Sequence, residues 1–317
     1  MNASLPGSLP AAYSAQAPEA VVMVRPHRFT VNTETAADNR FQLADDGGDG
    51  DLAAAAYAEI TRAAATLEGH GVTVHLFEDD GGHTPDSVFP NNWFSTHAGG
   101  HVALYPMKAP SRRRERRQDI LDMLKSRYRV QDVIDYSGLE ADGLFLEGTG
   151  AMVLDHVGRV AYAARSDRTD PIELERFATH FNFEPMAFDA RDEDGAPIYH
   201  TNVLMCVATG FAMIGLDMIP DRGRRMEIAR RLERSGRQVI PLTNRQVRAF
   251  AGNAMELQAG GGRILALSTT ALAALEREQI ETIAATATPV PLDIPTIEKA
   301  GGSVRCTLAG IHLTPRA

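Results

Sequence analysis

Short apolar runs alternate with longer stretches in which apolar positions recur at helical spacing, and this alternation repeats along the chain. Residues 21–24 and 72–77 are short apolar runs, and an Ala-rich stretch at 52–69 lies between them. Runs of β-branched residues favour strands, whereas helical spacing of apolar residues favours an amphipathic helix. The first unit is therefore predicted to be strand, helix, strand.

Four further units follow, and each is predicted to be a hairpin, a helix and a closing strand. Their segments are 93–94, 102–105, 111–128 and 130–134; 151–154, 160–163, 171–180 and 183–188; 203–207, 211–214, 223–235 and 239–241; and 254–258, 263–266, 270–286 and 290–292. Ser111 is the predicted N-cap of its helix. A short helix at 294–300 and a strand leading out of Cys306 end the pattern.

The recurrence of the unit about every 50–60 residues indicates a repeat architecture that must close to bury its faces. The alternation of strands and helices predicts an α/β array with helices outside and strand ends converging on an axis. No G-x-G-x-x-G follows an early strand, so an open sheet that binds a dinucleotide has no support. Residues 1–19 are predicted to be a flexible tail and 20–317 a single domain.

Composition and charge narrow the function. A net charge of −9 argues against binding to nucleic acid, which normally needs a basic surface. No apolar run is long enough to span a membrane. The run Arg112–Arg117 is read as the solvated start of a helix. His97 and His101 have the spacing of a helical metal pair, but Gly99-Gly100 between them favours a hairpin turn. With only two cysteines and no metal cluster in the sequence, we expect a cytoplasmic protein without metal or cofactor.

Cys306 is the candidate nucleophile. It follows the pair Gly301-Gly302 and stands directly after Arg305; glycines let the backbone approach a ligand, and a neighbouring cation favours the thiolate. A buried structural cysteine is the alternative reading of this residue taken alone. A thiolate nucleophile needs an imidazole to handle protons and a carboxylate nearby, and His200 and Glu147 supply them.

Other polar residues stand at matching places in the repeated units. Each has an ordinary structural reading when taken alone, as a turn residue, a loop carboxylate or a core histidine. If the units close around an axis, these positions converge at its mouth. They are Asp86, Asn92, Glu147, His200, Asn202, Asn253 and Cys306.

Five short motifs occur in the order known from one enzyme superfamily. They are Pro85–Asn92, Leu146–Gly150, Ser166–Thr169, His200–Asn202 and Gly301–Cys306. The combination, over about residues 20 to 315, resembles the guanidino-group-modifying enzymes of the pentein fold, which include arginine deiminases, dimethylarginine dimethylaminohydrolases and amidinotransferases. The resemblance implies a five-bladed α/β propeller of ββαβ units and a Cys-His-Glu site that uses no cofactor.

The resemblance also implies a role for each matching residue. Cys306 would attack the planar carbon, His200 would act as general acid and base, and Glu147 would lie near the substrate nitrogens. Arg168 looks like the family's arginine that clamps the substrate α-carboxylate, a task that suits a guanidinium fork. Asp86 would accept from the α-amino group.

Two departures from the family pattern bear on the substrate. Asn92 and Asn202 stand where arginine-acting relatives carry aspartates, and a buried guanidinium without a counter-charge is costly. A neutral ureido group can both donate to and accept from an amide. The sequence thus favours hydrolysis of citrulline to ornithine, ammonia and carbon dioxide.

Three alternatives stay open: an arginine deiminase, a dimethylarginine dimethylaminohydrolase, and a catalytically silent pentein that binds a ligand. An amidinotransferase is disfavoured because nothing marks a second acceptor pocket. We expect a small amino-acid substrate as the main partner, and a homo-oligomer is compatible with the sequence. The loop Asp38–Asp51 has the composition of a lid or of a plain surface loop.

Overall fold

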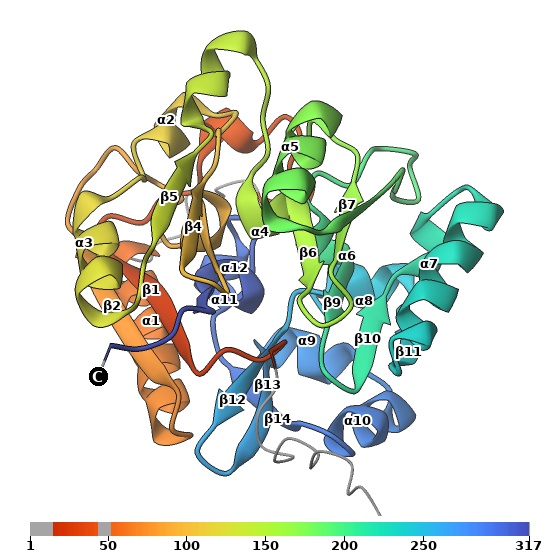
Figure 1. The fold of residues 1–317 in the computed structure, drawn as a ribbon. Helices are drawn as coiled ribbons and strands as arrows, with labels where there is room; N and C mark the ends of the chain where they lie inside the picture. Colours follow the sequence, from red (N-terminus) through yellow and green to blue (C-terminus); the bar gives the residue numbers. More distant parts are fainter. Residues whose placement is uncertain (1–14, 44–51, 317) are drawn as a thin grey trace, which may run out of the picture.

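The computed structural model describes residues 15–43 and 52–316. In these residues five sheets of three strands surround a central axis, and helices cover the outside (Figure 1). The sheets are β15-β1-β2, β3-β4-β5, β6-β7-β8, β9-β10-β11 and β12-β13-β14. In each sheet the first two strands are antiparallel and the last two are parallel. The predicted α/β propeller of five ββαβ units is therefore confirmed.

The five sheets follow one another around the axis. In each sheet, the strand named first below is short and faces the axis. The first sheet contains β15 (Ala309–Ile311), β1 (Ala20–Pro26) and β2 (Thr73–Asp79), and the second contains β3 (Phe94–His97), β4 (His101–Leu104) and β5 (Asp132–Asp135). The third contains β6 (Met152–Asp155), β7 (Val160–Ala164) and β8 (Glu184–Phe188). The fourth contains β9 (Met205–Val207), β10 (Phe211–Ile214) and β11 (Gln238–Pro241), and the fifth contains β12 (Met255–Ala259), β13 (Gly262–Ser268) and β14 (Thr288–Leu292).

The outer helices join the parallel strands, as the crossover between parallel strands requires. They are α1 (Leu52–Gly69), α3 (Gln118–Arg127), α5 (Pro171–Phe181), α7 (Arg222–Arg234) and α10 (Arg277–Ala284). Shorter helices are α2 (Pro110–Arg113), α8 (Asn244–Arg248), α9 (Thr269–Ala274) and α11 (Pro295–Glu298), with 3-10 turns η1 (Thr33–Thr35), η3 (Ser137–Asp142) and η4 (Leu216–Met218). Ile60, Ile120, Phe177, Ile228 and Ile283 on the five outer helices are fully buried.

The ring closes between the two ends of the described chain. β15 pairs antiparallel with β1, and Ala20 lies opposite Ile311. This pairing completes the first sheet, which would otherwise lack its inner strand. The sequence predicted a terminal strand after Cys306 but did not identify its partner.

Two predicted helices are each divided in the structure. The segment 111–128 forms α2 and α3, and Ser111 lies inside α2 instead of capping it, because Pro110 takes the first helical position after Ala109. The segment 270–286 forms α9 and α10, and the capping box of Glu276 starts the second helix. In the second case a local capping box interrupts a helical pattern that periodicity alone reads as continuous.

The predicted tail is partly packed. The side-chain amide of Gln16 is buried and donates to the carbonyls of Leu154 and Val207, on two inner strands. The packed chain therefore starts before residue 20, and residues 1–14 lie outside the described part. That 20–317 forms one domain stays a prediction.

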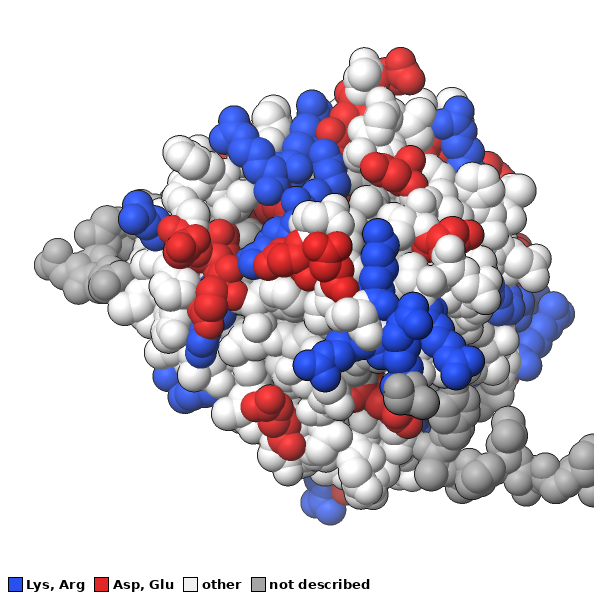
Figure 2. All heavy atoms as spheres, turned by 60° about the vertical axis from the view of Figure 1, so that its left-hand side comes forward, with Lys and Arg blue, Asp and Glu red and all other residues white. Residues whose placement is uncertain are grey.

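Three further expectations concern membrane-spanning helices, surface charge and the hairpin that carries His97 and His101. No helix of the described residues is long and apolar enough to cross a membrane. On the described face in Figure 2, groups of basic side chains lie beside groups of acidic ones, unlike the one-sign basic surface typical of nucleic-acid binding. His97 and His101 pair across the β3–β4 hairpin, as predicted.

Candidate active site

Short helical turns stand at the start of four inner strands and carry the predicted residues to the axis. They are η2 (Pro90–Asn92) before β3, α4 (Gly148–Ala151) before β6, α6 (Thr201–Leu204) before β9 and α12 (Val304–Thr307) before β15. Glu147 and His200 are the N-cap residues of α4 and α6, so they hold equivalent places in neighbouring units. One pocket is lined by Asp86, Asn92, Arg112, Arg168, His200 and Cys306.

The thiol of Cys306 is buried and accepts hydrogen bonds from two amides. The Nδ2 atoms of Asn202 and Asn253 lie 3.2 Å and 3.3 Å from Sγ. N–H groups that donate to a sulfur favour its anionic form, which is the nucleophile. Asn253 also accepts from the backbone N–H of Arg305, so it fixes both the thiol and the helix α12 that carries it.

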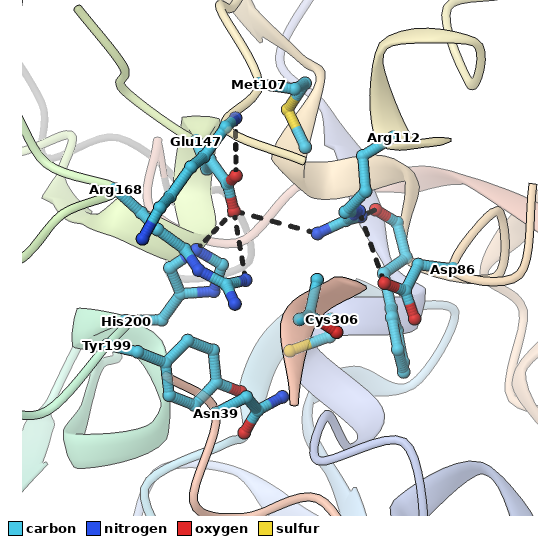
Figure 3. A network of polar contacts seen from close by, with 12 residues as sticks. Asn39, Asp86, Met107, Arg112, Glu147, Arg168, Tyr199, His200 and Cys306 are labelled. Carbon is cyan, nitrogen blue, oxygen red and sulfur yellow. Dashed lines mark hydrogen bonds and ion pairs between the residues drawn. The ribbon is translucent and has the colours of Figure 1, made fainter. Parts of the chain in front are cut away.

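His200 and Glu147 form a buried pair beside the thiol (Figure 3). Nε2 of His200 lies 2.8 Å from Oε2 of Glu147. A Cβ atom at Gly150 would stand 2.8 Å from both His200 Nδ1 and Asn92 Oδ1, so only glycine leaves room for the two side chains. Burial lowers the pKa of His200 to about 4, against the opposing effect of Glu147. The imidazole is therefore neutral at neutral pH and can accept a proton.

Glu147 is held ionised by several donors. Its Oε1 accepts from the backbone N–H of Lys108, and its Oε2 lies 3.4 Å from Nη1 of Arg168 and 3.8 Å from Nη1 of Arg112. Although burial acts to raise the pKa of Glu147, the charge of Arg168 and the His200 hydrogen bond hold it well below its ordinary value. The carboxylate is therefore positioned to orient His200 rather than left free for a ligand.

Arg168, the predicted carboxylate clamp, already binds a carboxylate in the unliganded structure. Its Nε and Nη2 donate to the two oxygens of Asp38, which Lys108 Nζ also contacts at 2.9 Å. The guanidinium lies over the ring of Tyr199, 5.0 Å from its centroid. Arg168 is thus arranged for two-point recognition of a carboxylate, and Asp38 occupies that arrangement.

The segment around Asp38 also covers the pocket. Thr35 and Asn39 line it, and the space left is about 10 Å³, which is barely enough for one water molecule. Asn39 Nδ2 donates to the carbonyl of Ala300. Of the loop considered as a lid, residues 38–43 are described, and Asp38 and Asn39 lie at the site. Residues 44–51 lie outside the described part.

Arg112 and Glu115 were not identified from the sequence, and the solvated reading of their basic run is wrong for both. Arg112 is 2% exposed, and its Nε and Nη2 donate to the two oxygens of Glu115 at 3.0 Å and 2.9 Å. Its Nε also lies 3.7 Å from Asp86 Oδ2. The spacing of Arg112 and Glu115, one helical turn apart, was the only signal of this pair.

Arg305 does not point into the pocket of Cys306. Its Nη1 donates to the carbonyl of Leu308, and its side chain lines a second cavity together with Cys206, His156 and His312. Burial lowers the pKa of Arg305 to about 10, while its electrostatic interaction with Cys306 acts in the opposite direction. Cys206 is a buried thiol whose pKa burial raises to about 12, so it is a structural cysteine.

Three buried oxygens of the pocket residues have no hydrogen-bond partner among the described residues. They are Asp86 Oδ1, Asn92 Oδ1 and Asn202 Oδ1. Buried acceptors are normally satisfied, so these three are available to accept from the N–H groups of a ligand. The described residues hold no group of three or more His, Cys, Asp or Glu side chains suited to a metal ion.

Two solved structures that share the fold are those of ArgZ and of a dimethylarginine dimethylaminohydrolase. The substrate-bound N-terminal domain of ArgZ, a cyanobacterial arginine dihydrolase, has a TM-score of 0.70 at 18% identity, and the match covers 92% of this chain and 97% of that domain. Dimethylarginine dimethylaminohydrolase (DDAH) from Pseudomonas aeruginosa, in complex with citrulline, has a TM-score of 0.62 at 13% identity, covering 93% of this chain and 99% of that one. Full-length ArgZ is longer, and this chain spans 41% of it.

No curated protein sequence matches the chain. The model of one family, described as N,N dimethylarginine dimethylhydrolase, eukaryotic, matches residues 25–313, which is most of the sequence. The match confirms the resemblance to guanidino-group-modifying enzymes, and its description is that of a hydrolase, the class expected from the sequence. The chain belongs to the N,N-dimethylarginine dimethylhydrolase family.

Proposed function

We propose that the protein hydrolyses the ureido group of citrulline through a covalent intermediate on Cys306. The observation that carries this proposal is one pocket lined by Cys306 and His200. The thiol accepts from two amides, and the imidazole is paired with buried Glu147. A thiol, an imidazole and a carboxylate that orients the imidazole form the arrangement of cysteine hydrolases.

The reaction follows from the protonation states of these groups. The proton of the Cys306 thiol passes to neutral His200, and Sγ adds to the ureido carbon. The imidazolium donates this proton to the side-chain nitrogen of ornithine as the C–N bond breaks, which leaves a carbamoyl group on Sγ. His200 then takes a proton from water, the hydroxide attacks the carbamoyl carbon, and the thiol regains its proton. The released carbamic acid breaks down to ammonia and carbon dioxide.

The charge of the pocket supports a ureido substrate over a guanidinium. Glu147 already accepts hydrogen bonds from His200 and Arg168, and the side chain that binds Cys306 from α6 is the neutral Asn202. The free oxygens of Asn92 and Asn202 can accept from the ureido NH₂ without needing a positive charge. Leaving a buried guanidinium out of reach of the carboxylate of Asp86 would cost several kcal/mol, on the order of 3.

Side chains of the pocket suit the two charged groups on the α-carbon of the substrate. Arg168 would bind the α-carboxylate once Asp38 moves, and Arg112 lines the same pocket with its Nη1 turned toward Glu147. Asp86 keeps Oδ1 free and would accept from the α-ammonium group.

Hydrolysis of a guanidino group is the second candidate. The family description names dimethylarginine, and ArgZ is an arginine dihydrolase. The unpartnered carboxyl oxygen of Asp86 could serve a guanidinium in a different substrate orientation, although burial raises the pKa of this group.

The discriminating experiment incubates the protein with citrulline, arginine and dimethylarginine separately, while ammonia, ornithine and citrulline are measured. Cys306→Ala is the negative control, and Cys206→Ala tests that the second cysteine is dispensable. Ornithine from citrulline supports the proposal. Citrulline formed from arginine or dimethylarginine establishes the guanidino activity instead. No turnover of any of them would favour a pentein that only binds its ligand.

A further inference from the structure

A third cavity, beside the one that Arg305 lines, lies at the opposite end of the inner strands from Cys306. β6 and β15 begin at the active-site turns α4 and α12, and they end directly before His156 and His312. These two histidines line a cavity of about 340 Å³ with Arg159, Tyr128 and the rim residue Glu19. We call it the axial cavity. No residue proposed for catalysis lines it.

Basic side chains gather around this cavity. The rings of His156 and His312 stack with centroids 3.9 Å apart, and His97, the last residue of β3, lies 6.3 Å from His156. His156 and His312 also line the smaller adjoining space that contains Arg305. Five basic groups, three imidazoles and two guanidinia, thus surround one end of the axis.

These basic groups lack carboxylate partners. In the described part of the chain no ion pair joins Arg159 or Arg305 to an acid; Arg159 donates only to the carbonyls of Phe181 and Asn182 and lies 3.8 Å over the ring of Phe183. Nearby Glu256 is engaged by Thr209 and Arg263, and Glu19 is exposed at the rim. Arg159 and Arg305 are both half-buried, and a partly desolvated cation without a counter-charge is stabilised by an anion beside it.

The pKa values of His156 and His312 agree with this lack of nearby negative charge. Burial, and after it the charges of His312, His97, Arg159 and Arg305, holds the pKa of His156 well below its ordinary value. Burial and the charge of Arg305 lower the pKa of His312 to about 4. A bound anion would relieve the repulsion among these groups.

We propose that the axial cavity binds a small oxyanion, a phosphate or a short carboxylate, between the free guanidinium donor of Arg159 and the rings of His156 and His312. The volume accommodates such an ion, and the donors come from two strand ends and one turn that packing holds in place. A planar fork and neutral imidazole N–H groups are suitable donors for either anion. The site is independent of the proposed reaction, because it shares no side chain with the pocket of Cys306.

The test measures thermal unfolding of the full chain in increasing inorganic phosphate, with chloride adjusted to keep the ionic strength constant. We expect a saturable rise in Tm that grows as the pH is lowered from 8 to 6, because phosphate binding favours protonation of the imidazoles. Arg159→Gln and His156→Gln should weaken phosphate affinity by roughly tenfold each, the loss of one charge-assisted hydrogen bond. Arg159→Lys keeps the charge and should retain most of the response.

Two matched variants separate this site from other cationic positions. Arg277→Gln removes an exposed arginine on α10, and Arg168→Gln removes an arginine of the active-site pocket; both should keep the phosphate response. A response that is not saturable, or that survives Arg159→Gln and disappears in Arg168→Gln, would overturn the proposal.

Discussion

Oε2 of Glu147 lies 2.8 Å from Nε2 of His200, although the two residues are 53 positions apart in the chain. That separation is about one propeller unit, and each residue is the N-cap of the turn before an inner strand. The contact fixes Nε2 as the protonated nitrogen of a neutral His200, because an ionised carboxylate can only accept. Nδ1, which faces the Gly150 backbone, is left to accept a proton.

Glu147→Gln tests the orienting role. The amide cannot hold the imidazole in this tautomer as firmly or stabilise the imidazolium, so we expect kcat to fall about 100-fold or more, the contribution typical of general acid–base catalysis. The measurement is steady-state release of ornithine and ammonia. Glu173→Gln removes another buried carboxylate, on α5, and should leave kcat unchanged. Equal activity of Glu147→Gln and Glu173→Gln would contradict the role.

Asn253→Ala tests the amide donors at the nucleophile. Loss of one of the two hydrogen bonds to Sγ should slow alkylation of Cys306 by iodoacetamide at pH 7, by about tenfold for a charge-assisted hydrogen bond. Peptide mapping should find Cys306 alkylated and Cys206, whose thiol has a raised pKa, unmodified. Equal alkylation rates of variant and wild type at pH 7 would oppose this account.

The double variant Asn92→Asp with Asn202→Asp tests why a ureido group is preferred. Two carboxylates would supply the missing counter-charge, so affinity for arginine should rise relative to citrulline. The comparison uses dissociation constants measured by calorimetry in the Cys306→Ala background, which prevents turnover. Asn92→Gln with Asn202→Gln changes size without charge and serves as the control. An unchanged preference in the aspartate variant would remove the argument from charge.

Acidification should destabilise the fold through His97. This ring is 2% exposed, packs 4.1 Å from the ring of Phe181, and leaves Nδ1 unpaired; burial holds its pKa well below the ordinary 6.5. The unfolded chain takes up the proton first, so the stability is fully present above pH 6.5 and is lost as the pH falls below it. One pKa unit corresponds to about 1.4 kcal/mol.

Thermal unfolding of wild type and His97→Phe between pH 7 and pH 5 checks this effect. The Tm of wild type should fall more steeply over the interval than that of His97→Phe, which has no proton to take up at this position. Parallel curves would show that His97 is not the source of the acid sensitivity.

The sequence predicted those elements whose signals are local. Helix α1 was predicted over Leu52–Gly69, the range that the structure describes, because apolar spacing marks the helix and a glycine is its last residue. The active-site turns α4, α6 and α12 were not predicted: each is four residues long, too short for a periodic pattern. The predicted strand at 203–207 therefore begins as α6.

The candidate site could be predicted only in part, because some of its contacts join residues that are far apart in the chain. The motifs place Cys306, His200, Glu147, Asp86, Asn92, Arg168 and Asn202 at the axis, and the structure brings all of them to one pocket or its hydrogen-bond partners. Arg112 and Arg113 are adjacent arginines in one basic run. Nothing in the sequence around them shows that Arg112 is buried and Arg113 is more exposed. The contact of Asp38 with Arg168 joins residues 130 positions apart, which no local pattern reveals.

The most direct measurement of the central claim is mass spectrometry of the protein quenched in acid during turnover of citrulline. The account predicts a mass increment of one carbamoyl group on the peptide that contains Cys306, present during turnover and absent after the substrate is consumed. Steady release of ornithine with no adduct on Cys306, or with the adduct on another residue, would contradict it.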